Sequence, residues 1–464
     1  MLLPIARVGI SVANHPSTVS DQIRGNHNLA ALLPVPTLGG MADPEQPGMY
    51  LADDPVVAQY ERWLYPAPVN DLRDPSVAQY VQGYGTLKGL SSIYWPAGGM
   101  REDLDVLVAG CGTMGAACYA LLNPRCKVVG IDISRAALAH EQKLKEHHRL
   151  DNLSLMHMPI EQAASLGKTF DFVACQGVLH HMPAPPAGLR ALGNVLRTDG
   201  VIAIMVYARY GRTGVYMLQD LFRLMGVEQT PEGVSIVRQT LANLHSDHPV
   251  QPYLRHATDL SSDAGLVDTF LHRRDKCYSV ADCLRLVDEA GLAFQGWDQN
   301  FFYYPEGVFQ NAPAVAQRIA QLPEQKIWEA MDLALGAKGV HYFHVCRRDR
   351  DPASYRIPWN SALLLDCIPT PLAKLAQVQK QSGGPPSLAL VQPNRMPIVV
   401  NEAQAAIFSH FDGRRSLAQC ATAAGIRETG DPLVRIIDGF FKLVWRCGFA
   451  NLRLPPKAST PAAI

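Results

Sequence analysis

The chain has 464 residues, of which 48% are hydrophobic and 18% charged, and its 42 basic residues balance its 42 acidic ones. This length indicates two or three domains, and the balanced charge argues against a general attraction to nucleic acid or to an acidic membrane surface. No apolar run reaches the roughly 18 residues of a membrane span, and the ten cysteines lack paired C-x-x-C spacing. We therefore expect a cytoplasmic enzyme with reduced thiols, without a zinc site or a disulfide framework.

The first hundred residues divide by composition. Residues 1–48 are rich in Pro, Gly, Asn and Ser without sustained periodicity, which predicts a disordered extension. Residues 52–95 carry many aromatic side chains, which predict helices that pack on a sheet.

The most informative segment follows. An apolar strand predicted over residues 106–109 runs into the spacing G-x-G-x-x-G, which begins at Gly110 and allows a tight turn into a helix. A second apolar strand, over residues 128–131, ends at Asp132. A carboxylate at a strand end can accept hydrogen bonds from both hydroxyls of a ribose. The glycine spacing is also the dinucleotide fingerprint, so a nicotinamide or flavin enzyme stays open at this point.

Strands and helices continue to alternate downstream, which predicts a parallel, doubly wound α/β sheet. The elements expected are strands over 152–158 and 201–207, a further strand over 170–182 that runs out into a loop, a helix over 189–196, a turn at 198–200 and a late antiparallel strand over 341–346.

Over roughly residues 50–350 the chain resembles the class I S-adenosylmethionine-dependent methyltransferases. Four segments carry the resemblance: VLVAGCGT (106–113), GIDIS (130–134), FDFVACQGVLHHM (170–182) and LRTDGVIAI (196–204). A dehydrogenase is not expected to carry the last two segments in this order. The resemblance implies a Rossmann-like fold and S-adenosyl-L-methionine as cofactor.

The resemblance also implies roles for single residues. The first loop contacts the methionine part of the cofactor, the acid after the second strand holds the ribose, and the ends of the third and fourth strands flank the adenine and the methionine. An aromatic side chain before the first strand is a candidate lid over the sulfonium. The loop residues are Gly110, Cys111 and Gly112, and the ribose acid is Asp132. Ile133 and Ile160 are expected beside the adenine, and Gln176 and Gly177 near the methionine. Tyr84 is the candidate lid.

Residues 208–300 are too long for an ordinary connection, and their helical spacing predicts an insertion that forms the acceptor pocket. Asp268, His272, Asp275 and Tyr278 are spaced polar residues within it. They are either pocket groups or turn and cap residues.

We expect a methyltransferase domain over residues 49–350, a linker over 351–384, a small α+β accessory domain over 385–456 and a tail over 457–464. Three amphipathic helices and a closing strand make the accessory domain similar to a winged-helix fold. Its arginines alternate with acidic residues, so a solvated or partner-facing surface is favoured over nucleic-acid binding.

Methyl transfer from a sulfonium needs alignment and exclusion of water, and a base only where the acceptor loses a proton. His180 and His181 follow the fourth strand and are the candidate catalytic bases; the alternative is that they cap a helix and pack at the sheet edge. A third ligand at recognisable spacing is lacking, so we predict no metal site.

The sequence therefore predicts S-adenosylmethionine-dependent methyl transfer to a small-molecule acceptor. Two alternatives stay open: a protein or peptide methyltransferase that uses the C-terminal domain for recognition, and a non-catalytic cofactor-binding regulator.

Overall fold

The computed structural model describes residues 54–98, 101–378, 386–393 and 395–455. The extension expected over 1–48 and the tail expected over 457–464 lie outside these ranges. In the described part of the chain, no helix has the length and apolar character needed to cross a membrane. The ten cysteines are all described, and each has a free thiol.

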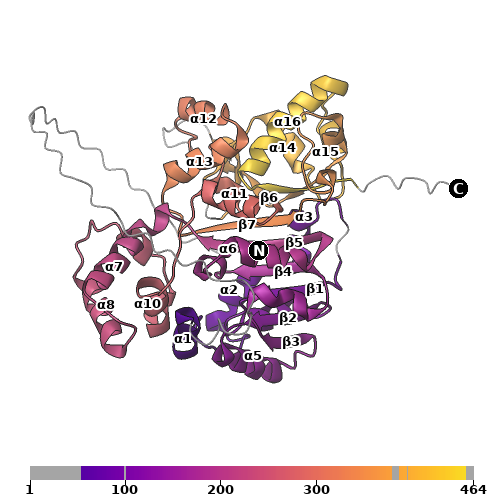
Figure 1. Ribbon diagram of the computed structural model, residues 1–464. Helices are drawn as coiled ribbons and strands as arrows, with labels where there is room; N and C mark the ends of the chain where they lie inside the picture. Colours follow the sequence, from indigo (N-terminus) through magenta and orange to yellow (C-terminus); the bar gives the residue numbers. More distant parts are fainter. Residues whose placement is uncertain (1–53, 99–100, 379–385, 394, 456–464) are drawn as a thin grey trace, which may run out of the picture.

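A seven-stranded sheet forms the centre of the fold, with strand order β3-β2-β1-β4-β5-β7-β6 (Figure 1). The first five strands in this order are parallel, whereas β7 pairs antiparallel with both β5 and β6. The doubly wound sheet with a late antiparallel strand is thus confirmed. The strands are β1 (Asp105–Ala109), β2 (Lys127–Asp132), β3 (Leu153–His157), β4 (Phe170–Gln176), β5 (Leu196–Tyr207), β6 (Leu292–Trp297) and β7 (Val340–Arg347).

Alternate residues of β1 enter two different cores, because successive side chains of a strand point to opposite faces of the sheet. Val106 and Val108 belong to the core on one face, and Leu107 and Ala109 to the core on the other. The first face is covered by α2 (Pro75–Tyr84), α3 (Leu87–Tyr94), α4 (Gly115–Leu122) and α5 (Arg135–His148), and the second by α6 (Pro185–Asn194), α11 (Val280–Glu289) and α13 (Glu324–Leu335).

The turn expected at residues 198–200 is absorbed into β5. This strand pairs with β4 at Leu196 and again from Val201 onward, with a register shift between the two points. The residues between them are therefore an irregularity within one strand rather than a turn between two elements.

Between β5 and β6 the chain adds helices that pack around a core of their own. Buried members of this core include Val215, Phe222, Val237 and Phe270. The unit lies beside the sheet, next to α1 (Figure 1). Its helices are α7 (Thr213–Leu224), α8 (Pro231–Asn243), α9 (Gln251–Leu254) and α10 (Asp263–Phe270); α1 spans Pro55–Arg62, and α12 (Pro313–Ala320) precedes α13.

The C-terminal domain begins earlier than expected, because the segment predicted as a linker belongs to it. Within that segment β8 (Ile368–Pro371) pairs with β12 (Ala450–Arg453), and Leu364 and Cys367 are fully buried in the domain core. Proline and glycine in 351–384 masked these short elements in the sequence.

Three helices and three further strands complete the described part of the domain, whose similarity to a winged-helix fold stays a prediction. The remaining elements are β9 (Lys374–Val378), β10 (Ser387–Val391), β11 (Ile398–Val399), α14 (Glu402–Ser409), α15 (Leu417–Ala423) and α16 (Gly430–Arg446).

Candidate active site

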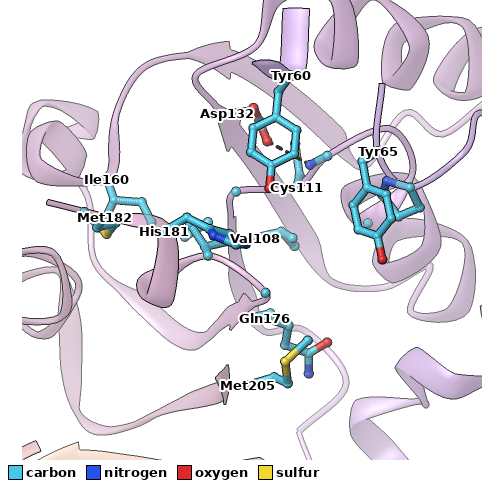
Figure 2. A pocket seen from close by; sticks show the side chains of 18 of the residues that line it. Tyr60, Tyr65, Val108, Cys111, Asp132, Ile160, Gln176, His181, Met182 and Met205 are labelled. Carbon is cyan, nitrogen blue, oxygen red and sulfur yellow. Dashed lines mark hydrogen bonds between the residues drawn. The ribbon is translucent and has the colours of Figure 1, made fainter. Parts of the chain in front are cut away.

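A cavity of about 1470 Å³ lies at the carboxyl ends of the parallel strands (Figure 2). Ligands bind at this edge in open α/β sheets. The volume exceeds the roughly 300–1,000 Å³ of an ordinary small-ligand pocket, so the cavity has room for two ligands. The residues expected to hold the cofactor all line it: Tyr84, Gly110, Cys111, Gly112, Asp132, Ile133, Ile160, Gln176 and Gly177.

The glycine loop after β1 has the backbone that its sequence requires. Gly110 and Gly112 have φ of +73° and +58°, in the left-handed region that favours glycine. A Cβ on Gly110 would lie 2.3 Å from a methyl group of Val178, so this position also lacks space for a side chain. The loop therefore presents bare backbone to the cavity.

Asp132 is tied to both neighbouring segments. One carboxylate oxygen accepts the N–H of Gly112 at 2.8 Å, as Figure 2 shows, and the other accepts the N–H of Ser134 at 2.8 Å. Burial raises the pKa of Asp132 above its usual value, and the two N–H groups oppose that shift. Each oxygen retains a lone pair, which suits a ligand with two adjacent hydroxyls.

Glu141 binds the start of the helix that follows the glycine loop, and it is not among the site residues expected from the sequence. Its two carboxylate oxygens accept the N–H groups of Ala116 and Ala117, at 2.8 and 2.9 Å, at the start of α4. Burial raises the pKa of Glu141 to about 8. A glutamate on the apolar face of α5, one turn from Leu138 and Leu144, was the available signal.

Two walls of different character flank the loop. Beside β2 and β3 the lining has the apolar side chains of Ile133, Met158 and Ile160, joined by Met182 from the segment after β4, together with the polar side chains of Glu161 and Gln162. At the end of β4, Gln176 lies beside Met205 (Figure 2). An apolar slot next to a ribose-type acid is suited to a purine base.

The segment after α1 lies against the glycine loop. The hydroxyl of Thr113 donates to the carbonyl of Pro66 at 2.8 Å, and the Ser134 hydroxyl donates to the carbonyl of Tyr60 at 3.3 Å. A Cβ on Gly112 would be 3.0 Å from the carbonyl oxygen of Tyr65. This segment thus closes the cavity on the side of the loop, and Figure 2 shows the rings of Tyr60 and Tyr65 there.

The two candidate histidines differ in position. His181 lines the cavity, whereas His180 is fully buried, stacks on Tyr207 with ring centroids 3.8 Å apart and has no hydrogen-bond partner on either ring nitrogen. Nδ1 of His181 lies 3.0 Å from the carbonyl oxygen of Arg274, so Nδ1 carries the proton and Nε2 keeps the lone pair. Burial lowers the pKa of His181 to about 4, which keeps this imidazole neutral at pH 7.

A directed hydrogen-bond chain continues from these histidines. The N–H of Arg274 donates to Nδ1 of His272, which places the proton of His272 on Nε2. That nitrogen lies 3.2 Å from the hydroxyl of Tyr60, and the same hydroxyl donates to Asp268 at 2.8 Å. Tyr207 donates to the other oxygen of Asp268 at 3.0 Å. Burial raises the pKa of Asp268 to about 6, although both hydroxyls lower it.

Of the four polar residues of the insertion that the sequence singled out, Asp268 lines the cavity and His272 adjoins it through Tyr60. Asp275 is buried beside Arg212, and Tyr278 joins its backbone to that of Tyr207 behind the cavity. The insertion thus supplies both pocket groups and structural groups.

The histidines and the aspartate of this hydrogen-bonded cluster are also residue types that can bind a metal ion. One ligand atom each of His181, Asp268 and His272 lie within 4.8 Å of one another, and Asp71, His147 and His148 form a second such group among the described residues. In the first group the Tyr60 hydroxyl bridges Asp268 and His272, and the proton on Nε2 of His272 occupies its metal-binding position. Asp268 and His272 are therefore already engaged in a hydrogen-bonded network, whereas Nε2 of His181 keeps its lone pair.

With this geometry in view, comparison with known proteins identifies the chemistry. The sequence model of a family described as "Methyltransferase domain" matches residues 101–240, which span β1 to α8 and include the glycine loop, Asp132 and both histidines. Residues 101–240 thus form a methyltransferase domain, and the protein is an S-adenosylmethionine-dependent methyltransferase.

Two relatives match different shares of the chain. The methyltransferase is 27% identical over 385 residues to an uncharacterized protein of Synechococcus sp., a match that covers 81% of this chain and 88% of the other. It is 31% identical over 125 residues to a ubiquinone biosynthesis O-methyltransferase of Psychrobacter arcticus, covering 26% of this chain and 46% of that one. The second match thus spans about a quarter of this chain and less than half of that enzyme.

A solved structure shares the fold over most of the methyltransferase. PKMT2 from Rickettsia typhi superimposes with a TM-score of 0.53 at 14% identity, covering 80% of this chain and 76% of that chain. At this identity the likeness concerns the fold.

The cavity fits the methyl donor of this class on grounds of its own. A glycine-rich loop, a buried carboxylate with free lone pairs and an apolar slot adjoin one another in the order of an amino acid, a ribose and a base. The match to a methyltransferase domain argues against the alternative of a nicotinamide or flavin enzyme.

Proposed function

We propose that this methyltransferase transfers a methyl group from S-adenosylmethionine to a small-molecule acceptor enclosed in the same cavity. One observation carries the proposal: the cavity that contains the glycine loop and Asp132 extends without interruption to polar residues at the end of β5 and in the insertion. Those residues are Tyr207, Arg212 and Asp268, which are buried, and Tyr253 and Asp259, which are half-buried. A chamber of this kind suits a molecule that can be surrounded, because buried polar groups recognise matching polar atoms.

Each part of the donor has residues suited to it. In this proposal the loop of Gly110, Cys111 and Gly112 contacts the methionine part, with Gln176 and Gly177 opposite. Asp132 accepts the two ribose hydroxyls. Ile133 and Ile160 hold the adenine, and Tyr84 lines the wall on the side of α2.

Methyl transfer is an in-line displacement in which the acceptor forms a bond to the methyl carbon as the carbon–sulfur bond breaks. The bonding pair of electrons leaves with the sulfur, which becomes neutral, so the leaving group needs no proton. The protein has to align the acceptor and exclude water. The contacts of Thr113 and Ser134 with the segment after α1 keep that side of the cavity closed.

His181 is the proposed general base for an acceptor that loses a proton. Its Nε2 is unprotonated and carries the lone pair that would accept the proton, and its ring borders the cavity. His180 is the weaker candidate of the two, because it does not line the cavity and is packed on Tyr207.

Incubation with methyl-labelled S-adenosylmethionine and a bacterial extract, separated into a small-molecule and a protein fraction, tests the proposal. Label in the small-molecule fraction is expected, and it should fall sharply with His181→Gln. Label in protein alone would favour a protein methyltransferase. Label in neither fraction, with donor binding intact, would favour a non-catalytic regulator.

A further inference from the structure

We propose that Arg212 binds an anionic group of the acceptor, a carboxylate or a phosphate, inside the cavity. This inference rests on the proposed function and narrows the class of acceptor. It concerns the end of the cavity that lies beyond the glycine loop, next to the inserted helices.

Arg212 is a buried cation that faces the cavity. It lies between β5 and α7, its exposed fraction is 1%, and it is among the lining residues. Its guanidinium carbon lies 3.7 Å from the ring centroid of Tyr207 and 5.2 Å from that of Tyr253. Two tyrosine rings therefore hold the guanidinium plane without neutralising its charge.

The hydrogen bonds of Arg212 are incomplete. A guanidinium has five N–H donors. Nη1 donates to the hydroxyl of Tyr253 at 2.9 Å, Nη2 lies 3.5 Å from Asp275, and Nε has no partner. A buried, charged donor without a partner is costly, so these groups favour an acceptor oxygen from a ligand.

The nearby acids do not complete the site. One oxygen of Asp275 forms a long ion pair with Nη2 of Arg212 at 3.5 Å and also accepts from Gln219 at 3.0 Å, whereas its other oxygen has no partner. Asp268 is engaged by Tyr60 and Tyr207. Two further acids of the lining are paired as well: Asp259 accepts from Tyr65, and Asp54 is bound through two contacts by Arg274, the second arginine of the lining. A bidentate oxyanion is the ligand that the planar fork of an arginine recognises best.

The position of Arg212 also limits the size of the acceptor. Arg212 and His181 both border Tyr207, and the ring centroids of His181 and Tyr207 are 5.6 Å apart. The anionic group and the nucleophile of the acceptor therefore both lie next to one phenol ring. This spacing fits a small hydroxy- or amino-substituted carboxylate or phosphate ester.

The test uses the full-length protein saturated with S-adenosylhomocysteine. Its thermal unfolding is followed against inorganic phosphate, acetate and the neutral acetamide, at matched ionic strength. We expect phosphate or acetate, but not acetamide, to raise the Tm in a saturable manner. Whichever anion binds distinguishes a phosphate group from a carboxylate.

Two variants assign the effect to the guanidinium. Arg212→Gln should weaken binding of the anion by at least about tenfold, the scale of a lost charge-assisted hydrogen bond. Arg212→Lys keeps the positive charge but loses the planar pair of guanidinium donors, so it should weaken anion binding less than Arg212→Gln does. If the glutamine variant does not fold, anion binding by the lysine variant is the test. Arg223→Gln, on the exposed side of α7, is the matched control and should change nothing.

Binding of neither anion, or equal binding by the wild type and the Arg212 variants, would overturn the inference. Binding of S-adenosylhomocysteine is recorded in the same samples. If that nucleoside binds and the anions do not, this inference alone fails; if the nucleoside does not bind, the proposed function fails.

Discussion

The carbonyl oxygen of Arg274 lies 3.0 Å from Nδ1 of His181, and the N–H of the same residue donates to Nδ1 of His272. One backbone unit thereby gives two neighbouring histidines opposite tautomers. His181 keeps a lone pair on Nε2, while His272 presents a proton to Tyr60. The side chain of Arg274 also donates to the carbonyl of His181 and to Asp54 at the start of α1. This residue therefore joins the insertion, the histidine segment and the first helix.

His181→Gln is expected to lower kcat on an identified acceptor by about 10²–10⁴-fold, the usual contribution of a general base. Affinity for S-adenosylhomocysteine should stay close to that of the wild type. His180→Gln is the matched comparison, because the side chain is buried behind the cavity; its kcat should change much less. Normal turnover by the His181 variant would remove this residue as the base.

Tyr60→Phe should lower the free energy of unfolding by about 1–3 kcal/mol, because it leaves Nε2 of His272 and one oxygen of Asp268 without their hydroxyl partner. Tyr216→Phe is the control, since the buried hydroxyl of Tyr216 has no hydrogen-bond partner. Denaturant unfolding of the two variants measures the difference. Equal stabilities would contradict the chain from His272 to Asp268.

Gly110→Ala should destabilise the fold and weaken donor binding, because it adds a clash with Val178 to an unfavourable φ. Gly167→Ala provides the control: φ is +65° there, with nothing within 4 Å of the added carbon, so only the conformational cost of about 1–2 kcal/mol applies. Adding Val178→Ala to Gly110→Ala should restore part of the stability. A Gly110 variant no less stable than the Gly167 variant would show that the loop relaxes.

Glu141 predicts a pH dependence of stability. Burial raises its pKa in the folded protein from an ordinary 4.5 to about 8. Between these values the folded state keeps a proton that the unfolded state has lost, so the free energy of unfolding falls as the pH rises. The difference between wild type and Glu141→Gln should therefore decline by up to about 1.4 kcal/mol per pH unit from pH 5 to 8.

The same denaturant titrations on Glu146→Gln serve as the control, because Glu146 is exposed on the same helix. A difference between wild type and Glu141→Gln that stays constant from pH 5 to 8 would contradict the raised pKa.

The cofactor end of the cavity could be predicted because its signals are local. Gly110 and Gly112 need special backbone angles, and Asp132 stands at the end of an apolar strand, so a short stretch of sequence contains the whole arrangement. The acceptor end could not be predicted in this way. Tyr60 and Asp268 are 208 residues apart in the chain, and only the fold brings them into contact.

The C-terminal boundary illustrates a second limit of the sequence. The strand β8 pairs with β12 about 80 residues later, and a four-residue strand that contains two prolines has no periodicity to detect. The domain also contacts the rest of the protein, since the N–H of Leu454 donates to the carbonyl of Pro96 at 2.7 Å. Truncation at residue 385 would therefore divide a folded unit.

Calorimetric titration with S-adenosylhomocysteine tests the central claim most directly. The wild type should bind the nucleoside, and Asp132→Asn and Asp132→Ala should lose about 1–3 kcal/mol of binding free energy, the scale of hydrogen bonds to a charged group. Thermal unfolding confirms that both variants are folded. Unchanged affinity in folded Asp132 variants, or binding of NADH in place of S-adenosylhomocysteine, would contradict the account.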